Sequence, residues 1–144
     1  MTRYCIFLGG LFAALAVALG AYHAHGLEKI LGDKFAFDPE LFSKRMGNWG
    51  TAASYQMYHS IGLILVGLIS MFRTSKWLSV AGVCFLVGIV LFSGLLYVLA
   101  WTDTRILGAI VPIGGVAMII GWIALALGGC CLTPTATVTL KPSK

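Results

Sequence analysis

The stretch "WLSVAGVCFLVGIVLFSGLLYVLAW", Trp77 to Trp101, decides the fold because it contains no charged residue. An α-helix rises about 1.5 Å per residue, so about 20 apolar residues are enough to cross the roughly 30 Å of hydrocarbon in a bilayer. Tryptophan stands at both ends of the stretch, and its ring favours the two membrane–water interfaces. The stretch therefore predicts a transmembrane helix anchored by one tryptophan near each interface.

Three further windows have the same character. Only 10% of the 144 residues are charged, against roughly 25% in an average soluble domain. All ten Lys and Arg and all five Asp and Glu residues lie outside the windows Tyr4–Leu27, Met46–Phe72, Trp77–Thr102 and Ile106–Leu140. We therefore predict an all-α integral membrane protein, in which residues 1–131 form one antiparallel four-transmembrane-helix bundle. The predicted spans cover about 4–26, 51–72, 77–101 and 106–131.

Residues 27–50 are predicted to form an outer loop that contains a short interfacial helix between helices 1 and 2. Asp38-Pro39-Glu40 has the features of a helix start: a capping carboxylate, a first-turn proline and an acid near the positive helix end. Apolar residues from Leu41 to Trp49 then recur near one face, which favours an amphipathic helix over about 39–49. The alternative is a single long helix that continues into the second span. Residues 132–144 are predicted to be a disordered polar tail.

Charge distribution gives the predicted orientation. Four spans place both termini and the Arg73–Lys76 turn on one side of the membrane, and each side then carries five Lys and Arg residues. Arg3, Arg73 and Lys76 adjoin their span ends, where positive charge favours the cytoplasm. We therefore expect both termini in the cytoplasm. The formal charge of +5 is interpreted as topology and attraction to lipid, and it gives no support for binding to nucleic acid.

The N-terminal stretch also resembles a secretory signal, because Arg3 precedes an apolar run with small residues near Ala14 to Ala18. The apolar run continues to Tyr22, which is longer than the usual core of such a signal. We therefore expect the first span to be retained.

The polar residues inside the spans are predicted to gather near the outer membrane face. In "GAYHAHGLEK", His23 and His25 point about 200° apart on a helix, so at most one of them faces the bundle. Counted from the outer helix ends, His25, Gln56, His59, Ser93 and Tyr97 lie no deeper than about 12 Å. The predicted polar cluster, structural or ligand-binding, is His25, Tyr55, Gln56, His59, Ser93 and Tyr97.

Small residues at helical spacing predict where the helices approach one another. Residues with small side chains let helix backbones come close in lipid, and a proline inside a span frees a backbone carbonyl one turn earlier. The predicted packing positions are Gly20, Ala24, Gly94, Pro112, Gly114, Gly115 and Gly121.

Four motifs carry a resemblance to a known family. "LGAYHAHGL", "YQMYHSIGLIL", "LFSGLLYVLA" and "IVPIGGVAMIIGW" resemble, in the same order, the motifs of the domain-of-unknown-function 423 family of small membrane proteins, which includes YgdD-like, YwdK-like and transmembrane protein 256-like members. The resemblance implies four helices in the bacterial inner (plasma) membrane and no established reaction. His23, Leu95 and Val111 depart from the pattern, which in the family usually has glycine, serine and threonine there.

Three functions are consistent with these features. The first is a structural or accessory component of a membrane assembly, in which the polar cluster fixes helix register. The second is a protein that binds a quinone, a lipid headgroup or haem through that cluster. The third is an oligomeric transporter, although no carboxylate or lysine lies within the spans to form an ion path.

The sequence does not predict an enzyme. It contains no CxxC or zinc-ligand spacing, no carboxylate pair and no set of nucleophile, base and orienting acid in the spans. We therefore expect no catalytic residues, no metal site and no cofactor. The expected partners are the lipid bilayer and other membrane proteins or further copies of this chain.

Overall fold

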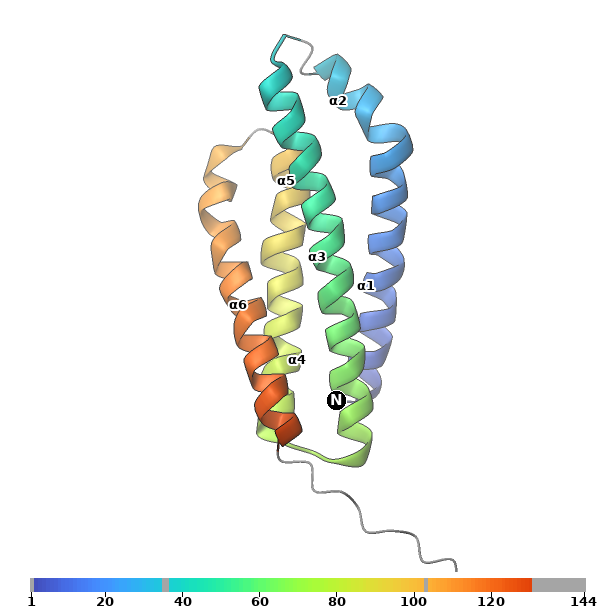
Figure 1. The fold of residues 1–144 in the computed structure, drawn as a ribbon, viewed down its shortest axis with the longest axis vertical. Coiled ribbons are helices and arrows are strands. Elements are labelled where there is room, and N and C mark those ends of the chain that lie inside the picture. Colours follow the sequence, from blue (N-terminus) through green and yellow to red (C-terminus); the bar gives the residue numbers. More distant parts are fainter. Residues whose placement is uncertain (1, 35–36, 103, 131–144) are drawn as a thin grey trace, which may run out of the picture.

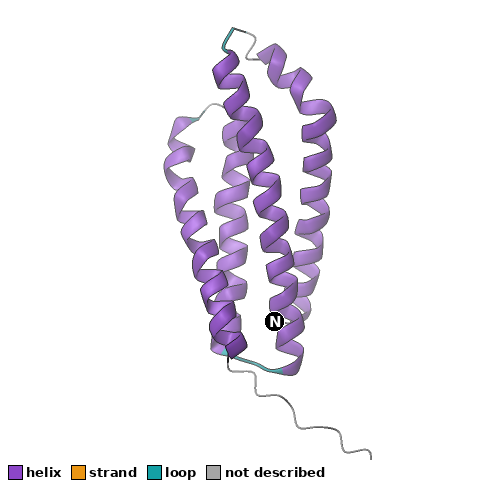
Figure 2. Ribbon diagram, in the orientation of Figure 1, coloured by secondary structure: helices purple, strands orange, loops and turns teal. Residues whose placement is uncertain are grey.

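The computed structural model describes residues 2–34, 37–102 and 104–130, and these form helices joined by short connections (Figure 2). Four helical stretches are long and apolar enough to cross a membrane. They are Thr2–Lys34, Pro39–Phe72, Lys76–Thr102 and Ile106–Cys130. The predicted all-α class with four membrane-spanning helices is confirmed.

Two of the four stretches contain a π-helical segment. The first consists of α1 (Thr2–Tyr22), η1 (His23–Leu27) and α2 (Glu28–Lys34). The second is α3 (Pro39–Phe72), a single α-helix. The third consists of α4 (Lys76–Gly88), η2 (Ile89–Gly94) and α5 (Leu95–Thr102). The fourth is α6 (Arg105–Cys130).

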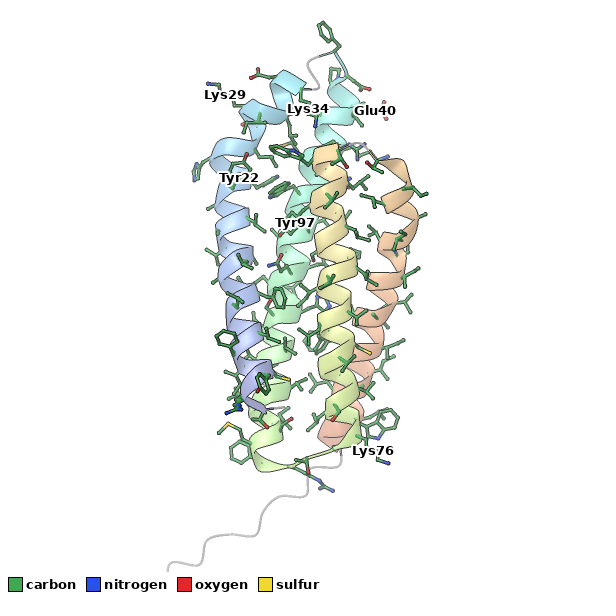
Figure 3. All side chains as sticks on the ribbon, turned by 180° about the vertical axis from the view of Figure 1, so that it is seen from behind. Tyr22, Lys29, Lys34, Glu40, Lys76 and Tyr97 are labelled. Atoms are coloured by element: carbon green, nitrogen blue, oxygen red, sulfur yellow. The ribbon has the colours of Figure 1, made fainter. Side chains whose placement is uncertain are left out.

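Consecutive stretches run in opposite directions, so the turns between them lie at two ends of the bundle (Figure 1). We name each end by the parts of the chain that it holds. The α2 end holds α2, the start of α3 and the turn between α5 and α6. The terminus end holds the start of α1, the turn between α3 and α4 and the end of α6. Figure 3 shows Lys29, Lys34 and Glu40 at the α2 end and Lys76 at the terminus end.

The helices pack mainly in chain order. α3 packs against α1 on one side and against α4, η2 and α5 on the other, while α6 packs against α4, η2 and α5 and barely touches α3. A buried cluster that includes Leu63, Leu78 and Phe85 joins α3 to α4. A second cluster, nearer the α2 end, joins Leu27, Leu31, Trp49 and Ala100. Because α3 and α6 are both held by the third stretch, a space is left between them.

Residues 39–49, predicted as an interfacial helix, are the first turns of α3 and not a separate element. The start is as predicted: Pro39 occupies the first turn, and the Leu41 backbone N–H donates to Asp38 Oδ1 at 2.9 Å. Glycine in a helix costs only about 1 kcal/mol, so Gly47 and Gly50 do not end the helix. Trp49 is 7% exposed and packs inside the bundle.

The remainder of the predicted outer loop is also largely helical. Leu27 and Leu31 are completely buried, and they hold η1 and α2 against the bundle. At the end of α2, the Lys34 ammonium donates to the Trp101 backbone carbonyl, and its nitrogen lies 5.6 Å from the centre of the Trp101 ring. The first stretch is therefore tied to the end of α5. The predicted polar tail, residues 132–144, lies outside the described residues.

Candidate functional site

Three side-chain hydrogen bonds fasten the first helical stretch to α3. Gln56 Nε2 donates to the Phe12 carbonyl at 2.9 Å, and Trp49 Nε1 donates to the Leu19 carbonyl at 3.0 Å. His23 Nε2 lies 3.0 Å from the Met46 carbonyl, and because a carbonyl only accepts, this nitrogen donates. Each bond joins a polar side chain of one helix to the backbone of its neighbour. These polar groups therefore stabilise the pairing of α1 and η1 with α3.

His23, and not His25, is the histidine that faces the bundle. His25 is exposed, so its predicted membership of the polar cluster is wrong. Residues two apart on a helix point in nearly opposite directions, and the packing of η1 on α3 decided which of the two turned inward. A Cβ placed on Gly50 would lie 3.4 Å from the His23 ring, which shows how closely the two helices approach there.

Tyr55 and His59 do not share a face with Gln56. Gln56 reaches α1, whereas the Tyr55 ring centre lies 4.8 Å from that of Phe92 in η2. The His59 ring lies 6.0 Å from Trp122 of α6 and 5.7 Å from Phe85 of α4. Adjacent residues on a helix are about 100° apart, so Tyr55 and Gln56 point to different neighbours. His59 lines the space between α3 and α6, whereas His25 is exposed, so these two rings do not face one another to bind a haem iron.

Tyr97 lies on the α1 side of the bundle with Gln56. The two residues line a hollow of about 240 Å³ between α1 and the third stretch. The Tyr97 ring meets Trp49 edge-on with ring centres 4.9 Å apart, and Figure 3 shows Tyr97 in the half of the bundle nearer α2. Ser93 is completely buried. Among the described residues, neither Ser93 Oγ nor Tyr97 OH has a hydrogen-bond partner. The predicted cluster is thus divided between two sides of α3.

On the other side of α3, a groove of about 630 Å³ lies between α3 and α6, with η2 as its floor. We call it the aromatic groove because Tyr55, Tyr58, Phe92 and Trp122 line it together with His59. The ring contacts run continuously through it: Tyr55 meets Phe92 and stacks on His59, and His59 meets Trp122. Tyr55, Tyr58 and Trp122 are partly exposed, so the groove opens at the lipid-facing surface.

Two predicted glycines explain why α6 sits so close to the third stretch. A Cβ on Gly114 would lie 2.4 Å from the Phe92 backbone nitrogen, and one on Gly121 would lie 2.7 Å from the Phe85 ring. Neither distance is possible for a real side chain, so both positions require glycine in this packing. Gly115 and Pro112, also predicted, line the aromatic groove. Because Gly114 and Gly121 carry no side chain, α6 packs directly against η2 and α4. The groove remains open between α6 and α3.

The other predicted packing positions make no such approach. A Cβ on Gly20 would meet nothing within 4 Å, and one on Gly94 would come no nearer than 3.9 Å to another atom. Ala24 is exposed. α1 instead meets α3 closely at Gly9 and Gly67, where an added Cβ would lie 2.7 Å from Ile64 and 2.6 Å from Ile6, respectively. Four-residue spacing alone did not identify the face that α1 turns toward α3.

His59, which lines the groove, has one ring nitrogen committed to a backbone hydrogen bond. Its Nδ1 lies 2.6 Å from the Tyr55 backbone carbonyl, and because that oxygen accepts, Nδ1 carries the hydrogen. In the neutral ring Nε2 is then left with a lone pair. His59 is only 5% exposed, and its ring is fixed by Tyr55, Phe85 and Trp122. The groove therefore combines flat aromatic surfaces with one fixed polar group.

A second hollow, of about 470 Å³, lies between α3 and α6 at the α2 end. We call it the basic hollow because Lys44, Arg45 and Asn48 line it. Arg45 is 3% exposed, and its Nη1 donates to the Leu99 carbonyl at 2.8 Å. Lys44 and Arg45 fall within residues 27–50, which the sequence predicts to be an outer loop. The spacing of Lys44 and Asn48 could have predicted the basic hollow. They are four residues apart, hence on one face of a helix that begins at Pro39.

The described part of the chain holds no group of three or more His, Cys, Asp or Glu residues that could bind a metal ion. Cys5, Cys84 and Cys130 are free thiols. The groups gathered in the two hollows are thus suited to hydrogen bonding, ring stacking and charge attraction.

Comparison with known proteins gives one consistent answer. Residues 19–115 match the family model described as protein of unknown function (DUF423). The chain is 51% identical to a UPF0382 membrane protein of Staphylococcus epidermidis, over 85% of this chain and 91% of the relative. It is 43% identical to UPF0382 membrane protein YwdK of Bacillus subtilis, over 85% of this chain and 92% of that relative. No solved structure matches.

Proposed function

The chain belongs to the DUF423 family, whose similar members are named as membrane proteins, and on that premise we propose that it is a non-enzymatic membrane protein that binds a small amphiphilic molecule. The aromatic groove between α3 and α6 is the observation that carries this proposal.

The dimensions and lining of the groove support binding of a small molecule. Ligand pockets are typically about 300–1,000 Å³ in volume and are mostly apolar, with a few fixed polar groups. The groove has a volume of about 630 Å³, an aromatic lining and the fixed His59 ring. Because its rim residues Tyr55, Tyr58 and Trp122 are partly exposed on the surface that faces lipid, a ligand would enter from the bilayer.

The proposal assigns no reaction to this groove. In a catalytic triad, the imidazole that acts as a base is oriented by a carboxylate. Here Nδ1 of His59 donates to the backbone carbonyl of Tyr55. The same bond makes His59 a fixed acceptor for a hydroxyl or N–H of a bound molecule.

A structural or accessory role is the second candidate. It is favoured by the three bonds in which His23, Trp49 and Gln56 donate to carbonyls of the neighbouring helix. These polar groups act inside the protein and are not directed to a ligand. On this alternative, the aromatic groove would be covered by another protein of the assembly.

Native mass spectrometry of the protein purified in mild detergent tests the proposal. We expect a small-molecule adduct on the wild-type chain. Gly115→Leu should remove it by filling the groove, because a Cβ at Gly115 would meet the Phe92 ring at 3.6 Å, an ordinary contact. Gly10→Leu is the matched control, since a Cβ there would meet nothing within 4 Å. An adduct that survives Gly115→Leu, or a co-purifying protein with no adduct, would overturn the proposal.

We also propose that the protein lies in the bacterial inner (plasma) membrane with both termini in the cytoplasm. Arg3 and Lys76 lie in the first turns of α1 and α4, and Arg73 directly follows α3. Lys and Arg close to span ends favour the cytoplasmic side. On this orientation, the α2 end and the basic hollow face outward.

A further inference from the structure

We infer that the molecule held by this protein is a membrane lipid with an anionic headgroup, whose headgroup occupies the basic hollow and whose acyl chain occupies the aromatic groove. This inference rests on the proposed function and names the class of ligand.

The two hollows follow one another along the same side of the bundle. Both lie between α3 and α6 above the third stretch. Val111 lines the basic hollow, and the next residue, Pro112, lines the aromatic groove. Leu96 belongs to the floor of the first and Phe92, one turn earlier, to the floor of the second. One elongated molecule that follows this side of the bundle, past the buried cluster of Ala52, Leu96 and Val111, can therefore reach both hollows.

The distance along α3 between residues of the two hollows matches the depth of one membrane leaflet. Asn48 lines the basic hollow and His59 lines the aromatic groove. At about 1.5 Å per residue, they are separated by about 16 Å along α3. Half of a hydrocarbon core of roughly 30 Å is about 15 Å. A molecule with its polar group at Asn48 would place an acyl chain beside His59 and Trp122.

The lining is positively charged in the basic hollow and uncharged in the aromatic groove, which matches the two parts of an anionic lipid. The basic hollow is lined by Lys44, Arg45 and Asn48, and no described acidic residue lines it. Asp38 directly precedes α3 and Glu40 lies in its first turn, and both are outside this lining. The lining of the aromatic groove contains no described charged residue. Positive charge and amide donors at one end with rings at the other favour an anionic headgroup and an apolar tail.

The position of Arg45 makes the basic hollow a fixed feature of the surface. Its side chain is 3% exposed, and Nη1 donates to the Leu99 carbonyl near the end of α5. Lys44, one residue earlier, is exposed at the rim. The buried guanidinium thus shapes the wall, while the mobile ammonium of Lys44 and the amide of Asn48 supply donors to a headgroup.

Lipid titration followed by native mass spectrometry tests the inference. The probes are dioleoyl phosphatidylglycerol, which is anionic, and dioleoyl phosphatidylcholine, which has the same chains and no net charge. We expect the wild type to retain the anionic lipid preferentially. Lys44→Gln should lower that preference about fivefold, the effect of one Lys near an anionic surface. Lys29→Gln, an exposed lysine on α2 outside the hollow, should leave it unchanged.

The outcomes separate this inference from the proposed function. Equal retention of the two lipids, with both lost in Gly115→Leu, would overturn the anionic headgroup and leave a groove ligand in place. Retention that is insensitive to Gly115→Leu would overturn both. Glycerol phosphate, which has the headgroup charge without acyl chains, should not compete at the same concentration. Competition by it would show that the hollow binds a free phosphate compound and would overturn the lipid assignment.

Discussion

Gly114 sets how closely α6 approaches the π-helical segment of the third stretch. A Cβ at this position would lie 2.4 Å from the Phe92 backbone nitrogen and 2.8 Å from the Leu91 carbonyl carbon. Backbone atoms cannot move aside as the end of a flexible side chain can. The position of α6, and with it the width of the aromatic groove, therefore depends on the hydrogen atom that glycine carries there.

Gly114→Ala should destabilise the bundle by about 1–3 kcal/mol, the usual range for overpacking a close contact. Thermal unfolding of the purified protein in detergent measures the change. Gly115→Ala is the control next to it, because a Cβ there would lie 3.6 Å from the Phe92 ring, at ordinary contact distance. Equal loss of stability in the two variants would show that the contact with the η2 backbone is not what makes Gly114 sensitive.

The sequence predicted several residues that lie at helix contacts better than it predicted which side of each helix faces the bundle. Gly114, Gly121 and Pro112 lie at contacts or hollows, as the motifs indicated. His25 and Gly20 do not, because the side of a helix that faces the bundle depends on how the helix is rotated when it packs. In α1 most positions are apolar whether they face lipid or protein. Hydrophobicity therefore does not show the inward face as it does in a soluble helix.

At the scale of elements, the pairing of α1 with α3 depends on few partners. α1 packs almost entirely against α3. Gln56 Nε2 and Trp49 Nε1 each donate to a carbonyl of α1, at Phe12 and Leu19. Apolar side chains gain little from leaving apolar lipid, so close backbone packing and such hydrogen bonds carry much of the association.

Gln56→Leu should lower stability by about 0.6–2 kcal/mol, because it keeps the side-chain volume and removes one interhelical hydrogen bond. Unfolding in detergent is again the measurement. Ser54→Ala, an exposed position two residues earlier on α3, should have no effect. Unchanged stability in Gln56→Leu would mean that the hydrogen bond from Gln56 to the Phe12 carbonyl adds nothing to the packing of α1 on α3.

The four spans could be predicted because each is a local property of the chain. An uninterrupted apolar run has to form a helix in lipid, where every backbone N–H and C=O must find a partner within the segment. The helical continuity of α3 from Pro39 into the second span could not be decided locally. Burial of Arg45 and Trp49 against other helices holds those first turns in the bundle.

At the scale of the whole molecule, charged residues gather at the two ends of the bundle. Glu28, Lys29, Asp33 and Lys34 belong to α2 at one end, and Arg73 and Lys76 flank the turn between α3 and α4 at the other. If the termini face the cytoplasm, the basic hollow lies in the outer leaflet and would bind lipid from that leaflet. The orientation therefore determines which leaflet supplies the proposed ligand.

Labelling with a membrane-impermeant maleimide tests the orientation. In a variant with its four cysteines replaced by alanine, Lys29→Cys should react in intact cells, and Arg73→Cys should react only after permeabilisation. Both positions are exposed, so accessibility in the folded protein does not differ between them. The reverse pattern would place the termini outside, and would assign the proposed ligand to the inner leaflet.

The sequence by itself determined that this chain is a membrane protein with four membrane-spanning helices, and that its polar groups are few. These follow from composition and from the length of apolar runs, and each is set by residues close together in the chain. Only the tertiary structure decided that Gln56 turns to α1 while Tyr55 and His59 turn to α6, and that Lys44 and Asn48 stand above the aromatic groove. The physical reason is that packing between helices fixes the rotation and separation of each one, and in lipid no hydrophobic pattern records that rotation in advance.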